Sequence, residues 1–245
     1  MAASASPLTL YTAGTPNGWK ASICLEELGL QYSVHRIDLG KGEQKEDWYL
    51  KINPNGRIPA IVDHEAGDLP VFESGSVLMY LAERDPQHRL LPADPRGRAE
   101  AVSWLFWQMG GLGPMAGQAD WWLAMASERS ETAIDRYVSE VQRLLSVMEK
   151  ALEGREWLAG GQYSVADIAC FTWVLMHDLW GISLAGSYPN LRAWTDRIKG
   201  RPAVQRGLNV PGPNMILNHT DMWKGWLEKA KQRLSGIKPI PEPEE

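Results

Sequence analysis

The order of strand-like and helix-like segments restricts the fold of this chain more than any other feature. Up to about Leu90, short apolar stretches of strand length alternate with stretches of helical spacing, whereas only helical spacing recurs after Arg96. The segment between them contains two prolines and is typical of a linker. The sequence therefore predicts a mixed first domain over residues 1–91, an all-helical second domain over 96–235, and a disordered tail over 236–245.

In the first region the predicted order of elements is βαβαββα. The predicted strands are Leu8–Tyr11, Tyr32–Asp38, Ala60–Val62 and Leu69–Phe72, and the clearest helices lie around Ile23–Leu30 and over Ser74–Glu83. A strand, a helix and a strand at this spacing favour a parallel pair joined by a right-handed crossover. The last two strands are close enough in sequence to form an antiparallel hairpin. This order is typical of the thioredoxin-like α+β fold.

The second region is predicted to be helical throughout. The predicted helices are Arg98–Met109, Glu131–Glu153, Ser164–Trp180, Pro189–Lys199 and Met222–Leu234. Ser164 and Asp167 have the spacing of a capping box, which marks a helix start. The uncharged stretch Ala101–Ala119 is just long enough to span a membrane, but Gly110–Pro114 interrupts it. We therefore expect a buried helix that bends at these glycines.

Composition and charge exclude several classes of function. The chain has 25 basic and 30 acidic residues, so nucleic acid is not an expected partner, because phosphate binding needs a clustered basic surface. The five histidines show no metal-ligand spacing, and we expect no metal. Cys24 and Cys170 form no disulfide framework, which suits a reducing compartment. Because Met1–Pro7 has no signal-peptide pattern, we expect a cytoplasmic protein with no membrane partner.

The loop Gly14–Gly18 joins a predicted strand to a predicted helix. At such a junction the positive end of the helix stabilises a thiolate, yet the loop itself contains no cysteine. Thr15 and Asn17 have polar groups that can donate hydrogen bonds to a sulfur atom brought by a ligand. The alternative is an ordinary helix cap, with Pro16 as a rigid first residue.

Two further loops contain polar groups that could bind parts of a ligand. In Asn53–Pro59, a cis bond before Pro59 would leave the Ile58 backbone free to pair with an extended peptide; the alternative is a plain surface turn. Ser74 is predicted as an N-cap whose helix amides can hold a carboxylate, and the preceding Glu73 can pair with an ammonium group. The alternative is a simple cap beside a solvated acid. Together the three loops favour a ligand with an amino-acid head, a peptide backbone and a thiol, and glutathione has all three.

Several motifs resemble those of glutathione transferases. In the first region these are Thr15–Lys20, Leu25–Leu30, Asp38–Gln44, Asn53–Asp63 and Phe72–Gly75, and in the second they are Trp104–Met115 and Ser164–Ala169. The Thr-Pro-Asn-Gly form is similar to the nu class and to the fungal nitrogen-regulator-like branch. The resemblance extends from about Leu8 to Pro202.

The resemblance implies a homodimer and a role for each matching position. Thr15 and Asn17 would face the glutathione sulfur, the Ile58 backbone ahead of Pro59 would pair with the cysteinyl part, and Glu73 with Ser74 would hold the γ-glutamyl head. The residues near the glycyl end would be Lys41, Gln44 and Arg57. Arg136 matches a class position that contacts a second glutathione, although a solvated arginine on a helix face is the alternative.

The resemblance also implies an activity. Members of the nu class reduce disulfides with glutathione and can hold two glutathione molecules, or the oxidised form, in one site. Many transferases instead activate the thiol with a Tyr or Ser after the first strand, but Tyr11 lies inside the predicted strand and is expected to pack. We therefore favour a disulfide reductase. The alternatives are a regulatory protein that binds glutathione with little catalysis, and conjugation or ether cleavage of an apolar electrophile.

Overall fold

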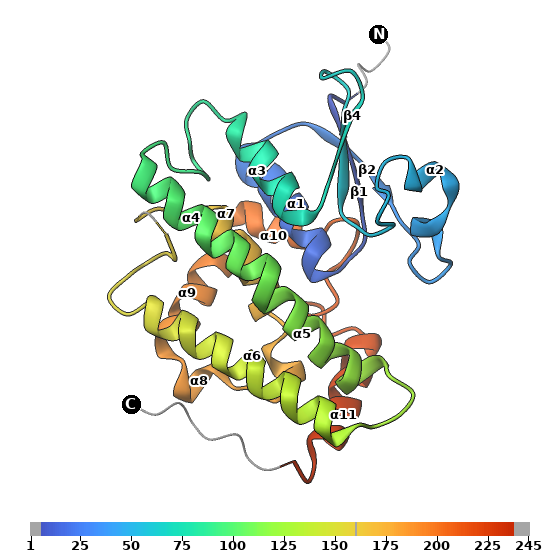
Figure 1. The fold of residues 1–245 in the computed structure, drawn as a ribbon, viewed down its shortest axis with the longest axis vertical. Coiled ribbons are helices and arrows are strands. Elements are labelled where there is room, and N and C mark those ends of the chain that lie inside the picture. The colour runs from blue at the N-terminus through green and yellow to red at the C-terminus, as the bar shows by residue number, and fades with distance from the viewer. Residues whose placement is uncertain (1–5, 160, 238–245) are drawn as a thin grey trace. The chain divides into compact units, whose positions relative to one another are not determined.

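The structure, a computed structural model, describes residues 6–159 and 161–237 (Figure 1). They form two compact units. The first contains the chain up to Ala93 together with Gly200–Asn214, and the second contains Asp94–Lys199 together with the chain from Met215. Of the predicted tail, only residues 236 and 237 are described; residues 238–245 lie outside the described part.

The first unit contains a four-stranded mixed sheet with the strand order β2-β1-β3-β4. Its strands are β1 (Leu8–Thr12), β2 (Tyr32–Arg36), β3 (Ala60–Asp63) and β4 (Leu69–Phe72). β1 pairs in parallel with β2 and antiparallel with β3, and β3 pairs antiparallel with β4. The helices in this part are α1 (Pro16–Leu28), α2 (Asp47–Leu50) and α3 (Ser74–Glu83), with α1 and α3 on one face of the sheet (Figure 1). The predicted thioredoxin-like order is confirmed.

The two faces of β1 are buried to different degrees. Leu8, Leu10 and Thr12 are buried, whereas Tyr11 points to the opposite face. There Tyr11 packs against a small cluster formed by Ile37, Tyr49 and Ala60. Tyr11 therefore packs within the sheet layer, as expected for a strand residue.

The segment Gly200–Asn214 joins the first unit through α10 (Pro202–Leu208). A Cβ atom on Gly207 would lie 2.6 Å from the Cα of Ile23, so α1 and α10 approach as closely as only glycine allows. Ser22 Oγ donates to Gly207 O at 2.7 Å. The predicted helical domain over 96–235 includes this segment, but in the structure α10 packs against α1.

The second unit is built from helices, listed here with their bounds: α4 (Pro95–Trp107), α5 (Gly113–Asp120), α6 (Glu131–Ala151), α7 (Val165–Val174), α8 (Leu184–Ser187), α9 (Pro189–Lys199) and α11 (Asp221–Leu234). A π-helical turn at Gln108–Leu112 separates α4 from α5, at the glycines where a bend was expected. The predicted helix from Ser164 to Trp180 is wrong at its end, because α7 stops at Val174 and a 3-10 turn covers His177–Trp180. No helix in the described part of the chain is long and apolar enough to cross a membrane.

The capping box predicted at the start of α7 is confirmed. Asp167 accepts hydrogen bonds from the backbone N–H groups of Leu158 (3.0 Å) and Ser164 (2.9 Å), and from the indole N–H of Trp194 (2.8 Å). Burial raises the pKa of Asp167 to about 6, although these donors oppose the shift. This carboxylate joins the α6–α7 loop, α7 and α9 into one core.

Candidate functional site

The first predicted site segment is the start of α1. Thr15 is the N-cap, and its Oγ1 accepts from Gly18 N at 3.2 Å. An accepting hydroxyl still has its own hydrogen to donate, so capping does not remove Thr15 as a donor to a ligand. Asn17 is half-buried in the first turn, beside backbone N–H groups at the positive end of a 13-residue helix.

In the loop before β3, one backbone carbonyl group accepts hydrogen bonds from two side chains. The Tyr49 hydroxyl and Asn53 Nδ2 both donate to Arg57 O, at 2.7 and 2.8 Å. The Ile58–Pro59 peptide bond is cis. Within the described residues, neither the N–H nor the C=O of Ile58 makes a hydrogen bond. An extended peptide can therefore pair with this backbone.

The third segment, at the start of α3, differs from the prediction. α3 begins at Ser74 itself, and Glu73 holds the N-cap position with φ +68° and no capping side chain. The predicted Ser74 cap is thus wrong, because the strained Glu73 backbone starts the helix one residue earlier than a serine cap would. A non-glycine residue at such a φ typically costs about 1–3 kcal/mol and is common at ligand clamps. The Glu73 carboxylate is exposed and accepts only from Asn55 Nδ2, at 3.2 Å, within the described residues.

Two polar residues near these segments were missed by sequence reasoning. Lys20 is 1% exposed and its ammonium donates to Ser74 Oγ at 3.2 Å, so it links α1 to the first residue of α3. A lysine inside a run of small and apolar helix residues was the available signal. Asn55, which holds the Glu73 carboxylate, gave no signal because its partner is distant in sequence.

The residues predicted near the glycyl end lie on two loops. Lys41 is exposed and pairs with Asp38, with 3.4 Å between Nζ and Oδ2. Gln44 lies on a 3-10 turn, and its Oε1 is buried with no hydrogen-bond partner in the described part of the chain. Such an oxygen needs a donor, and a ligand with a peptide N–H offers one. Arg57 is exposed on the neighbouring loop.

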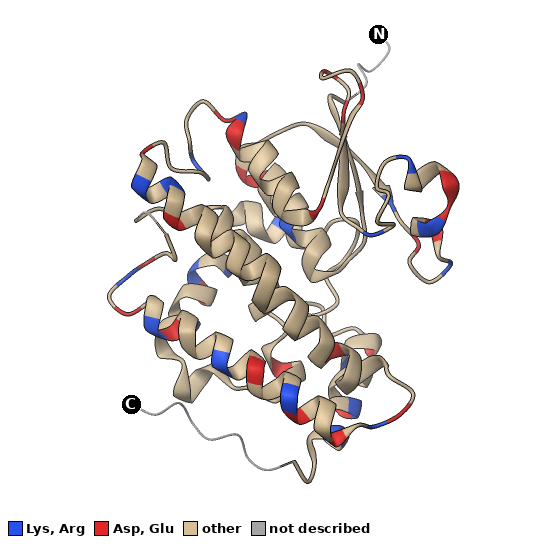
Figure 2. Ribbon diagram, viewed as in Figure 1, with Lys and Arg blue, Asp and Glu red and all other residues tan. Residues whose placement is uncertain are grey.

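Arg136 is the one predicted residue outside the first unit. It is exposed on α6, a helix on which acidic and basic side chains are interspersed (Figure 2). The role predicted for Arg136 stays a prediction.

Neither Tyr11 nor Cys24 offers an activated nucleophile or acid. Burial raises the pKa of the Tyr11 hydroxyl, and the fully buried Cys24 thiol also has a raised pKa. Both described cysteines, Cys24 and Cys170, are buried and form no disulfide. Among the described residues, no three His, Cys, Asp or Glu side chains lie close enough together to hold a metal ion. A reactive sulfur at this site therefore has to come from a ligand.

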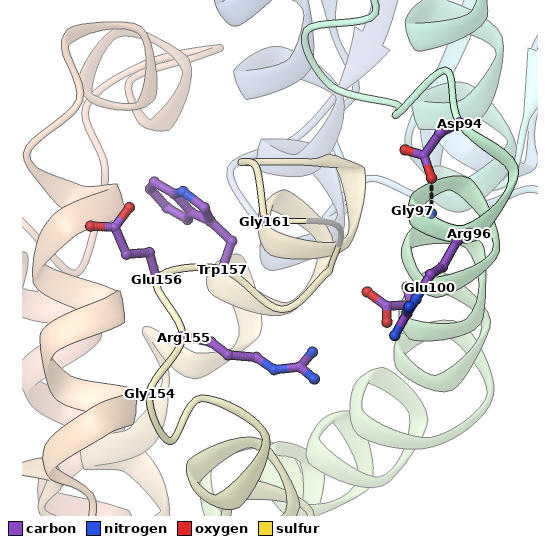
Figure 3. Close-up of a pocket in the computed structure, with 9 residues that line it drawn as sticks. All are labelled: Asp94, Arg96, Gly97, Glu100, Gly154, Arg155, Glu156, Trp157 and Gly161. Atoms are coloured by element: carbon purple, nitrogen blue, oxygen red, sulfur yellow. Dashed lines mark hydrogen bonds between the residues drawn. The ribbon is translucent and has the colours of Figure 1, made fainter.

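A separate pocket of about 480 Å³ lies in the second unit. Its charged lining residues are Asp94, Arg96, Glu100, Arg155 and Glu156 (Figure 3). Asp94 already caps α4 by accepting from Gly97 N at 2.8 Å. Ligand sites usually have a largely apolar lining with a few polar groups, and this pocket has the opposite character. None of the predicted site residues lines it.

Comparison with known families identifies the chain. The family model for the glutathione S-transferase N-terminal domain matches residues 6–83, and the model for the C-terminal domain matches residues 112–202. The chain belongs to the glutathione S-transferase family. It is 46% identical over 205 residues to the disulfide-bond oxidoreductase YfcG of Escherichia coli (strain K12), with 82% of this chain and 94% of that protein covered.

Solved glutathione transferases share the fold. One from Burkholderia graminis, with two glutathione molecules bound per subunit, is 43% identical with a TM-score of 0.78, covering 84% of this chain and 89% of that one. Another from Pseudomonas putida, with one glutathione disulfide per subunit, is 41% identical with a TM-score of 0.78, covering 84% of this chain and 93% of that one. The family resemblance and the two-part fold class predicted from the motifs are confirmed.

Proposed function

We propose that this protein is a glutathione-dependent disulfide reductase. The observation that carries the proposal is that one unit contains three recognition features: the Thr15 and Asn17 donors, the unpaired backbone of Ile58, and the strained Glu73. They match in turn the thiol, the peptide and the amino-acid head of glutathione. The name of the Escherichia coli relative and the ligands of the two solved neighbours support this choice.

Each part of glutathione has a stated partner in this proposal. The Glu73 carboxylate takes the α-ammonium group of the γ-glutamyl head, and Ser74 with the first amides of α3 takes its carboxylate. The Ile58 N–H and C=O pair with the cysteinyl residue ahead of Pro59. Lys41, Gln44 and Arg57 receive the glycyl end.

The proposed chemistry needs only a bound thiolate and its exchange reactions. Thr15, Asn17 and the α1 amides hold the glutathione sulfur as a thiolate, which attacks one sulfur of a substrate disulfide. That S–S bond breaks, a mixed disulfide forms, and the leaving thiolate takes a proton from water. A second glutathione thiolate, with Arg136 as the partner of one of its carboxylates, then attacks the mixed disulfide. The substrate is reduced to two thiols and two glutathiones are oxidised to one glutathione disulfide.

The groups at this site can supply the free energy needed to lower the pKa of the glutathione thiol. Lowering a thiol pKa by two units requires about 2.7 kcal/mol of preference for the thiolate. A helix N-terminus contributes about 0.3–1 kcal/mol, and each hydrogen bond to a charged acceptor contributes about 1.5–3 kcal/mol. One helix end and one or two side-chain donors are therefore sufficient.

Turnover tests the proposal directly. Wild-type protein should reduce a small mixed disulfide with glutathione well above the uncatalysed rate. Asn17→Ala should lower kcat/KM by about ten- to a thousandfold, because it removes one preorganised donor. Gln31→Ala is the matched control, because it deletes the carboxamide of an exposed residue after the C-terminal end of α1. This variant should leave kcat/KM unchanged.

Other outcomes would select the alternatives. Glutathione binding without turnover would favour a regulatory binding protein. Turnover of an aryl halide, but not of a disulfide, would favour conjugation. The proposal also includes a homodimer, so light scattering of the purified protein should give about twice the chain mass. The proposed location is the cytoplasm.

A further inference from the structure

The ring of His35 is held among aromatic side chains at the edge strand β2. Its centroid lies 5.2 Å from that of Tyr11 and 5.2 Å from that of Trp48. Tyr11 and Trp48 also contact Tyr49, so the three rings form an aromatic wall. His35 is exposed but packs one side of its ring against this wall, and its Nε2 lies 3.1 Å from Glu43 Oε1.

Glu43 uses both carboxylate oxygens to close the loop that follows β2. Its Oε2 accepts from the backbone N–H of Asp38 at 2.6 Å, while Oε1 accepts from His35. These two hydrogen bonds, the first of them the larger influence, hold the pKa of Glu43 below its usual range. The Glu43 carboxylate therefore links Asp38, at the start of this loop, to Glu43 itself, near its end, and to His35, which packs on the aromatic wall.

The closed loop carries two of the residues proposed to receive the glycyl end. The Asp38 side chain accepts from the backbone N–H groups of Gly40 (3.1 Å) and Lys41 (3.2 Å). Gln44 follows Glu43 directly on the 3-10 turn Glu43–Lys45. A shift of Glu43 therefore moves Gln44, whose buried Oε1 has no partner among the described residues.

We infer that His35 and Glu43 are positioning residues that set the affinity of this protein for the glycyl end of glutathione. The inference rests on the proposed function. His35 orients Glu43, Glu43 closes the loop, and the loop presents Lys41 and Gln44. Neither His35 nor Glu43 needs to touch glutathione for this effect.

A second set of contacts offers an internal comparison. Lys45 Nζ donates to Asn55 O at 3.2 Å, and Asn55 Nδ2 donates to the Glu73 carboxylate at 3.2 Å. Asn55 therefore orients the group proposed to bind the γ-glutamyl head. Loss of Asn55 should weaken binding of any γ-glutamyl thiol, whereas loss of His35 or Glu43 should weaken only ligands that contain the glycine.

The experiment compares glutathione with γ-glutamylcysteine, which lacks the glycine, as the thiol in the disulfide assay. Glu43→Ala and His35→Ala should each raise KM for glutathione about three- to tenfold, the effect of about one hydrogen bond, with kcat within twofold. KM for γ-glutamylcysteine should stay unchanged. Asn55→Ala should raise both KM values by the same factor.

Two further variants separate positioning from loss of structure. His35→Gln keeps a donor near Glu43 and should recover at least half of the lost affinity. His64→Gln is the matched control, because His64 forms another exposed histidine–carboxylate pair, with 2.5 Å between its Nδ1 and Asp68 Oδ1, on a residue directly after β3. It should leave both KM values unchanged.

Three results would overturn the inference. An unchanged KM for glutathione in Glu43→Ala would show that the loop does not set affinity. An equal rise for both thiols would show a general structural effect. Wild-type protein that uses neither thiol would remove the proposed function and, with it, this inference. The first two results leave the proposed function standing, because wild-type turnover remains.

Discussion

The N-terminal ends of α3 and α7 have residues of the same types, but the burial and hydrogen bonding of these residues differ. Each start contains a serine and an acidic residue. At α7, Ser164 and Asp167 bond to each other's backbone in a closed capping box, and both are fully buried. At α3, Glu73 occupies the cap position with a positive φ and leaves the helix without a side-chain cap.

This difference shows what makes a helix start available to a ligand. The Asp167 carboxylate already accepts several hydrogen bonds, so the first amides and the acid of α7 have no capacity left for a ligand. The Glu73 carboxylate is exposed. A cap with its donors and acceptors satisfied stabilises the fold, whereas an uncapped start with an exposed acid can bind a zwitterionic head group.

The largest expected effect tests the structural side of the comparison. Asp167→Ala should lower the free energy of unfolding by about 3 kcal/mol or more, because each buried donor left without an acceptor costs about 1–3 kcal/mol. Glu73→Ala should change it by less than about 0.5 kcal/mol, as surface substitutions usually do. Urea denaturation measures both values. Similar losses for the two variants would remove the contrast between the helix starts.

An effect of comparable size depends on pH and concerns a second buried acid. Burial raises the pKa of Asp120 to about 7, although the Trp180 indole N–H donates to it at 2.7 Å. In the unfolded chain its pKa is about 3.9, so the folded state binds the proton more tightly. The stability that this proton contributes is complete below about pH 4 and is lost as pH rises to about 7, by at most about 1.4 kcal/mol per pH unit.

Asp120→Asn tests this sign. Because the variant cannot ionise there, its free energy of unfolding should rise relative to wild type between about pH 4 and 7. Asp167 titrates in both proteins, so its contribution cancels in the difference. Parallel pH profiles for the two proteins would contradict the assignment.

The smallest expected effect tests the functional side. Glu73→Gly should stabilise the protein by about 1 kcal/mol, because glycine adopts a positive φ without the strain of about 1–3 kcal/mol, offset by its own entropy cost of about 0.5–1 kcal/mol. The same change should raise KM for glutathione about tenfold, through loss of one charged partner.

His88→Gly is the control for this prediction. His88 also has a positive φ, 53°, and lies in the segment after α3. It should give a similar gain in thermal stability with no change in KM. A Glu73→Gly variant that loses stability would show that the strain argument is wrong.

Much of the fold follows from local signals. The βαβαββα order, the α7 capping box and the interruption at Gly110–Pro114 each depend on residues within a few positions of one another. The Thr15 cap and the exposed Glu73 could be proposed in the same way. By contrast, the cap at Ser74 was predicted wrongly because the positive φ of Glu73 has no sequence signature.

Local patterns in the sequence specify where helices and strands form and which loops have donors and acids for a thiol peptide, since hydrophobic periodicity and capping act over short distances. Packing of distant segments brings α10 against α1 at Gly207, Lys20 against Ser74, and Asn55 against Glu73. It also brought Glu43 within reach of His35. These contacts join side chains on different elements, and their partners depend on how the elements pack, which no local pattern records.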